Sequence, residues 1–107
     1  MIIVSVISAR GGSTGLPNKN IKKLYGKPLI YWSIQQAKKV KSLKKNVFVS
    51  TDSNIIKEHA IKSGALVPFK RSKNLSRKYT PKFEVWKDAV KKIEKIIKNK
   101  IDIYVDL

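Results

Sequence analysis

A glycine-rich segment carries the residues with the clearest chemical potential in this sequence. It spans residues 9–21 and reads ARGGSTGLPNKNI, with three glycines in its first seven positions. Glycines let the backbone turn tightly and direct successive N–H groups toward one side, which forms an anion-binding concavity. Arg10, Ser13 and Lys19 add two cations and a hydroxyl to these donors. Together, these groups suit the charge and the oxygen atoms of a triphosphate.

Two familiar phosphate-binding loops do not match this segment. A P-loop requires G-x-x-x-x-G-K-[ST], and no glycine here is followed by Lys-Ser or Lys-Thr at that spacing. The dinucleotide fingerprint G-x-G-x-x-G leads directly into a helix, whereas Gly15 is followed by Leu16 and Pro17. A solvated glycine-rich turn is the alternative, and the neighbouring cations favour phosphate binding over it.

The elements around this segment predict an α/β fold. Residues 2–8 form a nearly continuous apolar, β-branched run, which is typical of a strand buried on both faces of a parallel sheet. Further strands are predicted over 47–49, 65–69 and 101–107, and helices over about 28–40, over 54–63 and from residue 80 to about 97. Strands that alternate with helices predict a parallel sheet with right-handed crossovers. The glycine-rich segment then lies at the carboxyl edge of the sheet, where open α/β sheets bind ligands.

Local signals set the expected ends of these elements. Pro28 suits the first position of a helix, and Asp52 or Ser53 suits the N-cap of the next one, with capping favoured over a ligand role for Asp52. Gly64 suits the end of that helix, and Pro68 restricts the third strand to an edge.

The chain is predicted to form one domain over residues 1–107, because it contains no repeat, low-complexity tract or linker. The sequence stops within or directly after its fourth predicted strand. A strand left there presents an unpaired apolar edge. We therefore expect the chain to be the first half of a longer domain, and to self-associate through residues 101–107.

The charge is large but its composition is informative. The 107 residues include 24 Lys and Arg against 7 Asp and Glu, a net charge of +17, and all but three of the cations are lysines. Proteins that read bases and phosphates rely on the bidentate fork of arginine, so a nucleic-acid partner is not expected. The absence of cysteine and the single histidine exclude disulfides, cysteine-ligated metals and multi-histidine metal sites. No apolar run approaches the roughly 20 residues of a membrane span, and we expect a cytoplasmic protein with no membrane partner.

Residues 9–21 resemble the signature loop of the acylneuraminate cytidylyltransferase family, which includes CMP-sialic acid synthetases and relatives that act on other nonulosonic acids. Further matches follow in order: GKPLI at 26–30, VSTD at 49–52, and GA at 64–65 with VPFKR at 67–71. They cover the whole chain but only the first half of the family's catalytic domain. One departure is Thr14, which stands where a lysine is common and so removes one charge from the loop.

The resemblance implies a fold and an activity. The fold is a three-layer, mostly parallel Rossmann-like sheet of strand order 3-2-1-4, interrupted after the fourth strand. The activity is transfer of CMP from CTP to a nonulosonic, sialic-type acid sugar, with Arg10 and Lys19 as catalytic residues that neutralise and orient the triphosphate. The further nucleotide-binding residues that it implies are Gly11, Gly12, Ser13, Asn20 and Arg71.

The resemblance also implies partners and leaves alternatives open. It implies Mg²⁺ held by acidic residues outside this chain, a homo-oligomer, and no catalytic activity from the 107 residues alone. One alternative is another sugar-acid nucleotidyltransferase, such as a 3-deoxy-manno-octulosonate cytidylyltransferase. Another is a basic module that binds nucleotides or nucleic acid and has no enzymatic activity.

Overall fold

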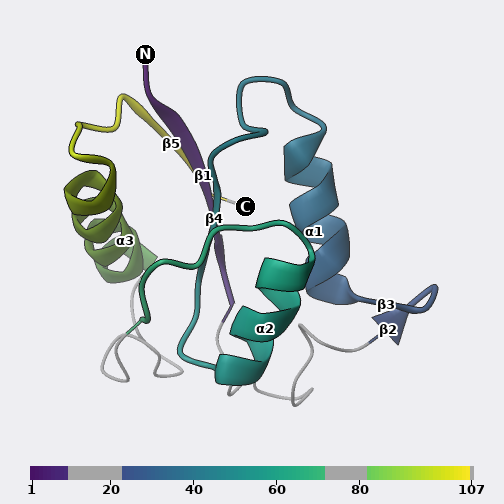
Figure 1. Cartoon of the computed structure of the whole chain (residues 1–107). Coiled ribbons are helices and arrows are strands. Elements are labelled where there is room, and N and C mark those ends of the chain that lie inside the picture. Colours follow the sequence, from purple (N-terminus) through teal and green to yellow (C-terminus); the bar gives the residue numbers. More distant parts are fainter. Residues whose placement is uncertain (10–22, 72–81, 107) are drawn as a thin grey trace.

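The structure is a computed structural model that describes residues 1–9, 23–71 and 82–106 (Figure 1). Its elements in chain order are β1 (Ile3–Ser8), β2 (Lys23–Leu24), β3 (Lys27–Pro28), α1 (Leu29–Lys38), β4 (Val47–Ser50), α2 (Asn54–Lys62), α3 (Lys82–Ile97) and β5 (Ile103–Asp106). Figure 1 shows a central sheet with α3 on one side and α1 and α2 on the other. The three-layer α/β prediction is therefore confirmed.

The sheet is parallel, and β1 is its central strand. The strand order is β4-β1-β5, with Ser8 beside Ser50 and Val6 beside Asp106 in the register. The predicted third strand is reduced to one parallel bridge, in which the N–H of Leu66 donates to the carbonyl of Val47 at 2.8 Å. The strand order 3-2-1-4 is thus confirmed.

The full strand predicted over residues 65–69 is wrong. Pro68 has no N–H to donate, which gives a physical reason for the bridge at Leu66 not to extend into a longer ladder.

The side chains of β1 alternate between two hydrophobic cores. Ile7 packs with the buried residues of α1 and α2, whereas Val4 and Val6 pack with Phe48 of β4 and with buried residues of α3. A strand side chain two positions further along points to the same face. This alternation therefore shows which face of the sheet each side chain near the ends of β1 and β4 points to.

The boundaries of α2 depend on one cap and one glycine. The Ser53 hydroxyl accepts a hydrogen bond from the N–H of Ile56 at 3.3 Å, and this makes Ser53 the N-cap. Of the two predicted candidates for the N-cap, Asp52 and Ser53, the structure thus selects Ser53. Gly64 follows the helix with a φ of +95°, a conformation that glycine adopts without the steric cost of a Cβ.

The hairpin formed by β2 and β3 was not predicted. Its turn residues, Tyr25 and Gly26, have φ values of +50° and +78°, as a two-residue type I′ turn requires. The indole Nε1 of Trp32 in α1 donates a hydrogen bond to the carbonyl of Leu24 at 2.8 Å. This bond ties the hairpin to the first turn of α1.

Helix α1 begins at Leu29, with Pro28 as its N-cap rather than its first helical residue. The predicted start of α3 at Thr80 and Pro81 lies outside the described residues. None of the helices in the described part of the chain combines the length and the apolarity that crossing a membrane requires.

Candidate functional site

The glycine-rich segment begins at the carboxyl edge of the sheet. Ala9, the last described residue before it, is fully buried, and its N–H donates to the carbonyl of Ser50 at 2.9 Å. Of the predicted site residues, Arg71 lies in the described part of the chain. The others lie outside the described residues; they are Arg10, Gly11, Gly12, Ser13, Lys19 and Asn20.

Two serines end the neighbouring strands β1 and β4 at this edge. Ser8 and Ser50 are register partners, and each lies two positions beyond a residue of the core under α3, so both point to the α3 face. Both hydroxyl oxygens are buried, and neither has a hydrogen-bond partner among the described residues. A buried hydroxyl without a partner costs about 1–3 kcal/mol. A polar ligand at this edge would remove that cost.

Arg71 places a cation at the same edge. It is 4% exposed, and its N–H donates to the carbonyl of Thr51, the residue that follows β4, at 3.0 Å. The guanidinium offers five N–H donors in a planar fork that matches phosphate and carboxylate oxygens. The nucleotide-binding role that the resemblance implies for Arg71 stays a prediction.

An aromatic pair lies between α3 and β5 on this face. The rings of Trp86 and Tyr104 are 6.2 Å apart between centroids. The indole Nε1 and the phenol oxygen are both buried, and neither has a hydrogen-bond partner in the described ranges. Burial raises the pKa of the Tyr104 hydroxyl above its usual range, and the negative charge of Asp106 raises it further. Tyr104 therefore stays a neutral hydrogen-bond donor even at a pH where an exposed tyrosine ionises.

This raised pKa predicts a stability change at high pH. Above about pH 10 the unfolded chain releases the Tyr104 proton while the folded chain retains it, so the free energy of unfolding falls as pH rises. Urea unfolding between pH 8 and pH 11 should therefore show a shallower fall for Tyr104→Phe than for the unmodified chain. Tyr25→Phe, at a tip residue that is 89% exposed, is the matched control and should behave as the unmodified chain does. Equal slopes for all three proteins would contradict the assignment.

The described residues do not assemble a metal site. No group of three or more His, Asp or Glu side chains occurs among them. Asp102 accepts a hydrogen bond from the N–H of Ile2 at 2.6 Å, so it lies at the amino end of β5, while Asp106 lies at the carboxyl end. The two carboxylates therefore do not form a pair.

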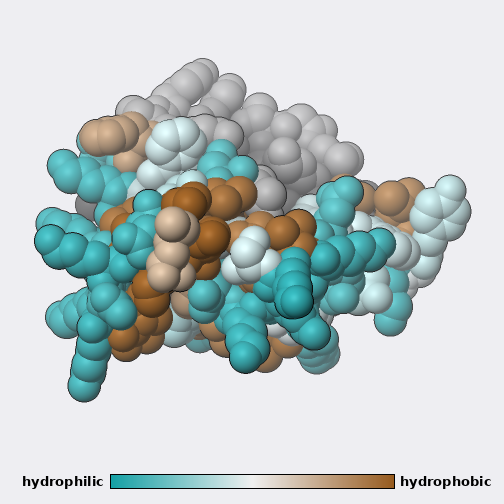
Figure 2. All heavy atoms as spheres, turned by 90° about the horizontal axis from the view of Figure 1, so that it is seen from above, coloured by the Kyte–Doolittle hydropathy of each residue, from teal (hydrophilic) through white to brown (hydrophobic). Residues whose placement is uncertain are grey.

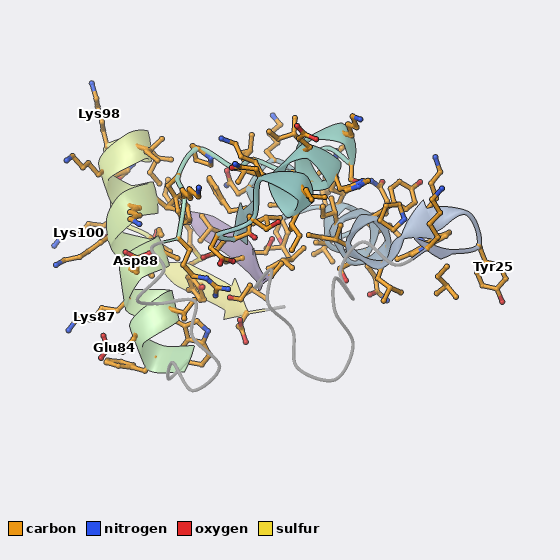
Figure 3. All side chains as sticks on the ribbon, turned by 90° about the horizontal axis from the view of Figure 1, so that it is seen from below. Tyr25, Glu84, Lys87, Asp88, Lys98 and Lys100 are labelled. Atoms are coloured by element: carbon orange, nitrogen blue, oxygen red, sulfur yellow. The ribbon has the colours of Figure 1, made fainter. Side chains whose placement is uncertain are left out.

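Sequence reasoning missed part of this face. Ser8 and Ser50 carried a usable signal, because each is a polar residue that ends a run of buried strand residues. The ring of Trp86 packs against Tyr104, and its buried N–H adds a polar function. Figure 3 looks onto the carboxyl edge of the sheet, with α3 at the left and the hairpin that carries Tyr25 at the right.

The family model for cytidylyltransferases matches residues 4–103 of the chain. This chain belongs to the cytidylyltransferase family. The resemblance stated from the glycine-rich segment is thereby confirmed, and the matched range includes the ends of both β1 and β4.

The curated cytidylyltransferases that the chain matches act on acid sugars according to their names. A CMP-N,N'-diacetyllegionaminic acid synthase of Campylobacter jejuni is 42% identical over 105 residues, which are 98% of this chain and 44% of that protein. A pseudaminic acid cytidylyltransferase of the same species is 45% identical over 85 residues, which are 79% of this chain and 36% of that protein. The chain thus spans less than half the length of these relatives.

A solved cytidylyltransferase shares the fold. A CMP:2-keto-3-deoxy-manno-octonic acid synthetase complexed with CTP superposes with a TM-score of 0.79 at 26% identity. The likeness covers 100% of this chain and 39% of that one.

Proposed function

We propose that this chain is the nucleotide-binding part of an enzyme that joins CMP from CTP to a nonulosonic, sialic-type acid sugar and releases pyrophosphate. One observation carries the proposal: Ala9, where the glycine-rich segment begins, lies at the carboxyl edge of the sheet, where the buried Arg71 and the hydroxyls of Ser8 and Ser50 also lie. The names of the Campylobacter relatives supply the class of sugar.

The proposed reaction is an in-line nucleotidyl transfer. The anomeric hydroxyl of the sugar attacks the α-phosphorus of CTP, loses its proton, and pyrophosphate leaves. Arg10 and Lys19 neutralise the charge on the phosphates as it moves onto the leaving group, which is the kind of electrostatic stabilisation that lowers such barriers most.

The remaining site residues bind the nucleotide. Gly11, Gly12 and Ser13 donate N–H and hydroxyl hydrogen bonds to the phosphates, Asn20 lies near the sugar or base of the nucleotide, and Arg71 approaches it from the edge of the sheet. No group of three or more His, Asp or Glu side chains that could hold Mg²⁺ occurs among the described residues. We propose that any Mg²⁺ is held by residues outside this chain, and no step above depends on it.

The class of acid sugar has a second candidate. The fold is shared with an enzyme named for 2-keto-3-deoxy-manno-octonic acid, so a 3-deoxy-manno-octulosonate cytidylyltransferase remains the alternative. The higher identity to the legionaminic and pseudaminic acid enzymes favours the nonulosonic class. Substrate profiling of the longer protein with both kinds of acid sugar separates the two.

The other partners are also proposals. We propose a homo-oligomer, a cytoplasmic location that follows from the need for CTP, and no membrane or nucleic-acid partner. Lys91 and Lys95 on α3 and Lys98 directly after it are exposed, and hydrophilic side chains project on both sides of a hydrophobic band in Figure 2. This distribution supports a solvated basic surface rather than a nucleic-acid footprint. We expect the 107 residues alone to bind CTP without turning it over.

A nucleotide panel tests the proposal. Isothermal titration calorimetry of the 107-residue chain at about 0.15 M salt, where free charges are screened beyond about 8 Å, should give saturable 1:1 binding of CTP. We expect CTP to bind at least about tenfold more tightly than UTP, ATP or tripolyphosphate, because base contacts and phosphate contacts both contribute. Equal affinity for CTP, ATP and tripolyphosphate would show attraction to the +17 charge alone and would contradict the proposal.

A further inference from the structure

A second group of aromatic and polar side chains lies on the outer face of α1. A cavity of about 410 Å³ is lined there by Tyr31, Trp32, Gln35, Gln36 and Lys39. The spacing of these positions, 31, 35 and 39 with 32 and 36, places them along one stripe of a helix. Helix α1 covers the face of the sheet opposite α3 (Figure 1), and none of the described residues that line this cavity is assigned to the nucleotide site proposed above.

The aromatic side chains of this cavity are held in place. The rings of Tyr31 and Trp32 meet at 80° with centroids 5.2 Å apart. Trp32 is fixed by its hydrogen bond to the hairpin and remains 39% exposed. Tyr25 adds a third ring, 6.5 Å from that of Trp32, and Figure 3 shows it at the tip of the hairpin, projecting away from the body of the molecule. Rigid exposed rings of this kind provide flat apolar surface at a low cost in conformational entropy.

The backbone conformation of Tyr25 adds evidence that the sequence specifies this arrangement of aromatic rings. A positive φ brings the Cβ of a non-glycine residue close to the following carbonyl oxygen, and Tyr25 adopts a φ of +50° while remaining 89% exposed. Such strained positions cluster at functional sites.

The polar side chains of the cavity are amides and one ammonium group. Gln35 donates from Nε2 to the carbonyl of Ser63 at 2.7 Å, which fixes its amide and leaves Oε1 as an acceptor. Gln36 and Lys39 are exposed. Amides both donate and accept, as sugar hydroxyls do, and the ammonium of Lys39 attracts an anion because none of the described lining residues is acidic.

We propose that this cavity is a binding site for an acidic sugar, separate from the nucleotide site. The apolar face of the sugar ring packs on the exposed ring of Trp32, with Tyr31 against its edge. Its hydroxyls bond to Gln35 and Gln36, and its carboxylate pairs with Lys39. The volume lies within the 300–1,000 Å³ range of small-molecule pockets and is suited to a single sugar. The ligand is either the free acid sugar or the same sugar carried on CMP, since both present this ring and this carboxylate.

Nuclear magnetic resonance of the ¹⁵N-labelled 107-residue chain tests the site directly. The chain has two tryptophans and therefore two indole N–H signals, which Trp32→Phe assigns. Titration with N-acetylneuraminic acid should shift the Trp32 indole signal and the side-chain amide signals of Gln35 and Gln36, with saturation in the millimolar range, and should leave the Trp86 indole signal unchanged.

Variants and ligand analogues separate this site from general attraction of anions. Lys39→Gln should weaken binding of the free acid at least fivefold, and the methyl ester of the sugar should bind the unmodified chain just as weakly. Tyr31→Ala should weaken binding of both the acid and its ester. Lys41→Gln, an equal charge change at an exposed lysine that does not line the cavity, is the matched control and should bind as the unmodified chain does.

The outcomes show whether the site accepts the free acid sugar or the sugar carried on CMP, and some of them would overturn the proposal. A Trp32 shift with the free acid, with CMP-N-acetylneuraminic acid, or with both supports the site and shows which source it accepts. The proposal is overturned if neither sugar shifts Trp32 saturably, if acetate or CMP alone produces the same shift, or if the Trp86 indole signal shifts in its place. Because no CTP is present, each of these outcomes is independent of the proposed nucleotidyl transfer.

Discussion

Replacing Lys19 by alanine is expected to weaken CTP binding by about 10- to 100-fold, and replacing Arg10 by alanine is expected to have an effect of the same size. A hydrogen bond to a charged group contributes about 1.5–3 kcal/mol, and each 1.4 kcal/mol changes a dissociation constant about tenfold. Both cations are assigned to the triphosphate, so the loss should be largest for CTP and smaller for CMP. Calorimetric titration of both variants with the two nucleotides measures this.

A matched control separates placed charges from total charge. Lys41→Ala removes the same single charge from an exposed position in the segment that leads into β4, and so at the amino edge of the sheet. It should leave the CTP affinity within a factor of two of the unmodified chain. If Lys41→Ala weakens CTP binding as much as Lys19→Ala does, the glycine-rich segment has no special role and the proposed function loses its main support.

Replacing Arg71 is the second change expected to weaken CTP binding strongly. Arg71 lies within the described part of the chain. Arg71→Ala should weaken CTP binding by about 10- to 100-fold. Arg71 is nearly buried at the carboxyl edge, so water cannot easily take the place of its hydrogen bonds to the nucleotide once the side chain is removed. Arg71→Lys keeps the charge but loses the planar fork, so it should restore part of the affinity. Calorimetry at matched salt concentration compares the two variants.

The control for this pair is the neighbouring lysine. Lys70 is exposed, and Lys70→Ala removes a charge one position away while its carbonyl still accepts the hydrogen bond from Lys92. It should bind CTP as the unmodified chain does. Urea unfolding of each variant shows whether the fold is intact. A folded Arg71→Ala variant with unchanged CTP affinity would contradict the role of Arg71.

The sequence was sufficient to predict the sheet but not its smallest parts. The runs that became β1, β4 and β5 are apolar and β-branched, because the sheet is covered on both faces. The hairpin was missed because its strands have two residues each, and its Tyr25-Gly26 turn lacks the Asn-Gly or Asp-Gly pair that marks such turns. Pro68 did indicate that the third strand lies at an edge of the sheet. It did not show that this strand would be reduced to one bridge at Leu66.

The same contrast holds for the caps and the site. Asp52 and Ser53 both carry side chains that cap helices, and only the backbone position of Ser53 relative to the N–H of Ile56 decides between them. The cations of the site were evident from the glycine-rich segment, since their residue types and order are distinctive. Buried hydroxyls such as that of Ser50 become visible only when the two strands are placed in register.

Mapping the CTP site by nuclear magnetic resonance tests the central claim most directly. The ¹⁵N-labelled chain is titrated with CTP, and the backbone signals of Ser8, Ser50 and Arg71 are followed together with the two indole signals. CTP bound at the carboxyl edge should give saturable shifts at these three residues and at the Trp86 indole, which lies on the α3 face, with the Trp32 indole unchanged. Saturable shifts confined to α1 and the hairpin, or no saturation at any signal, would contradict a nucleotide site at the carboxyl edge of the sheet.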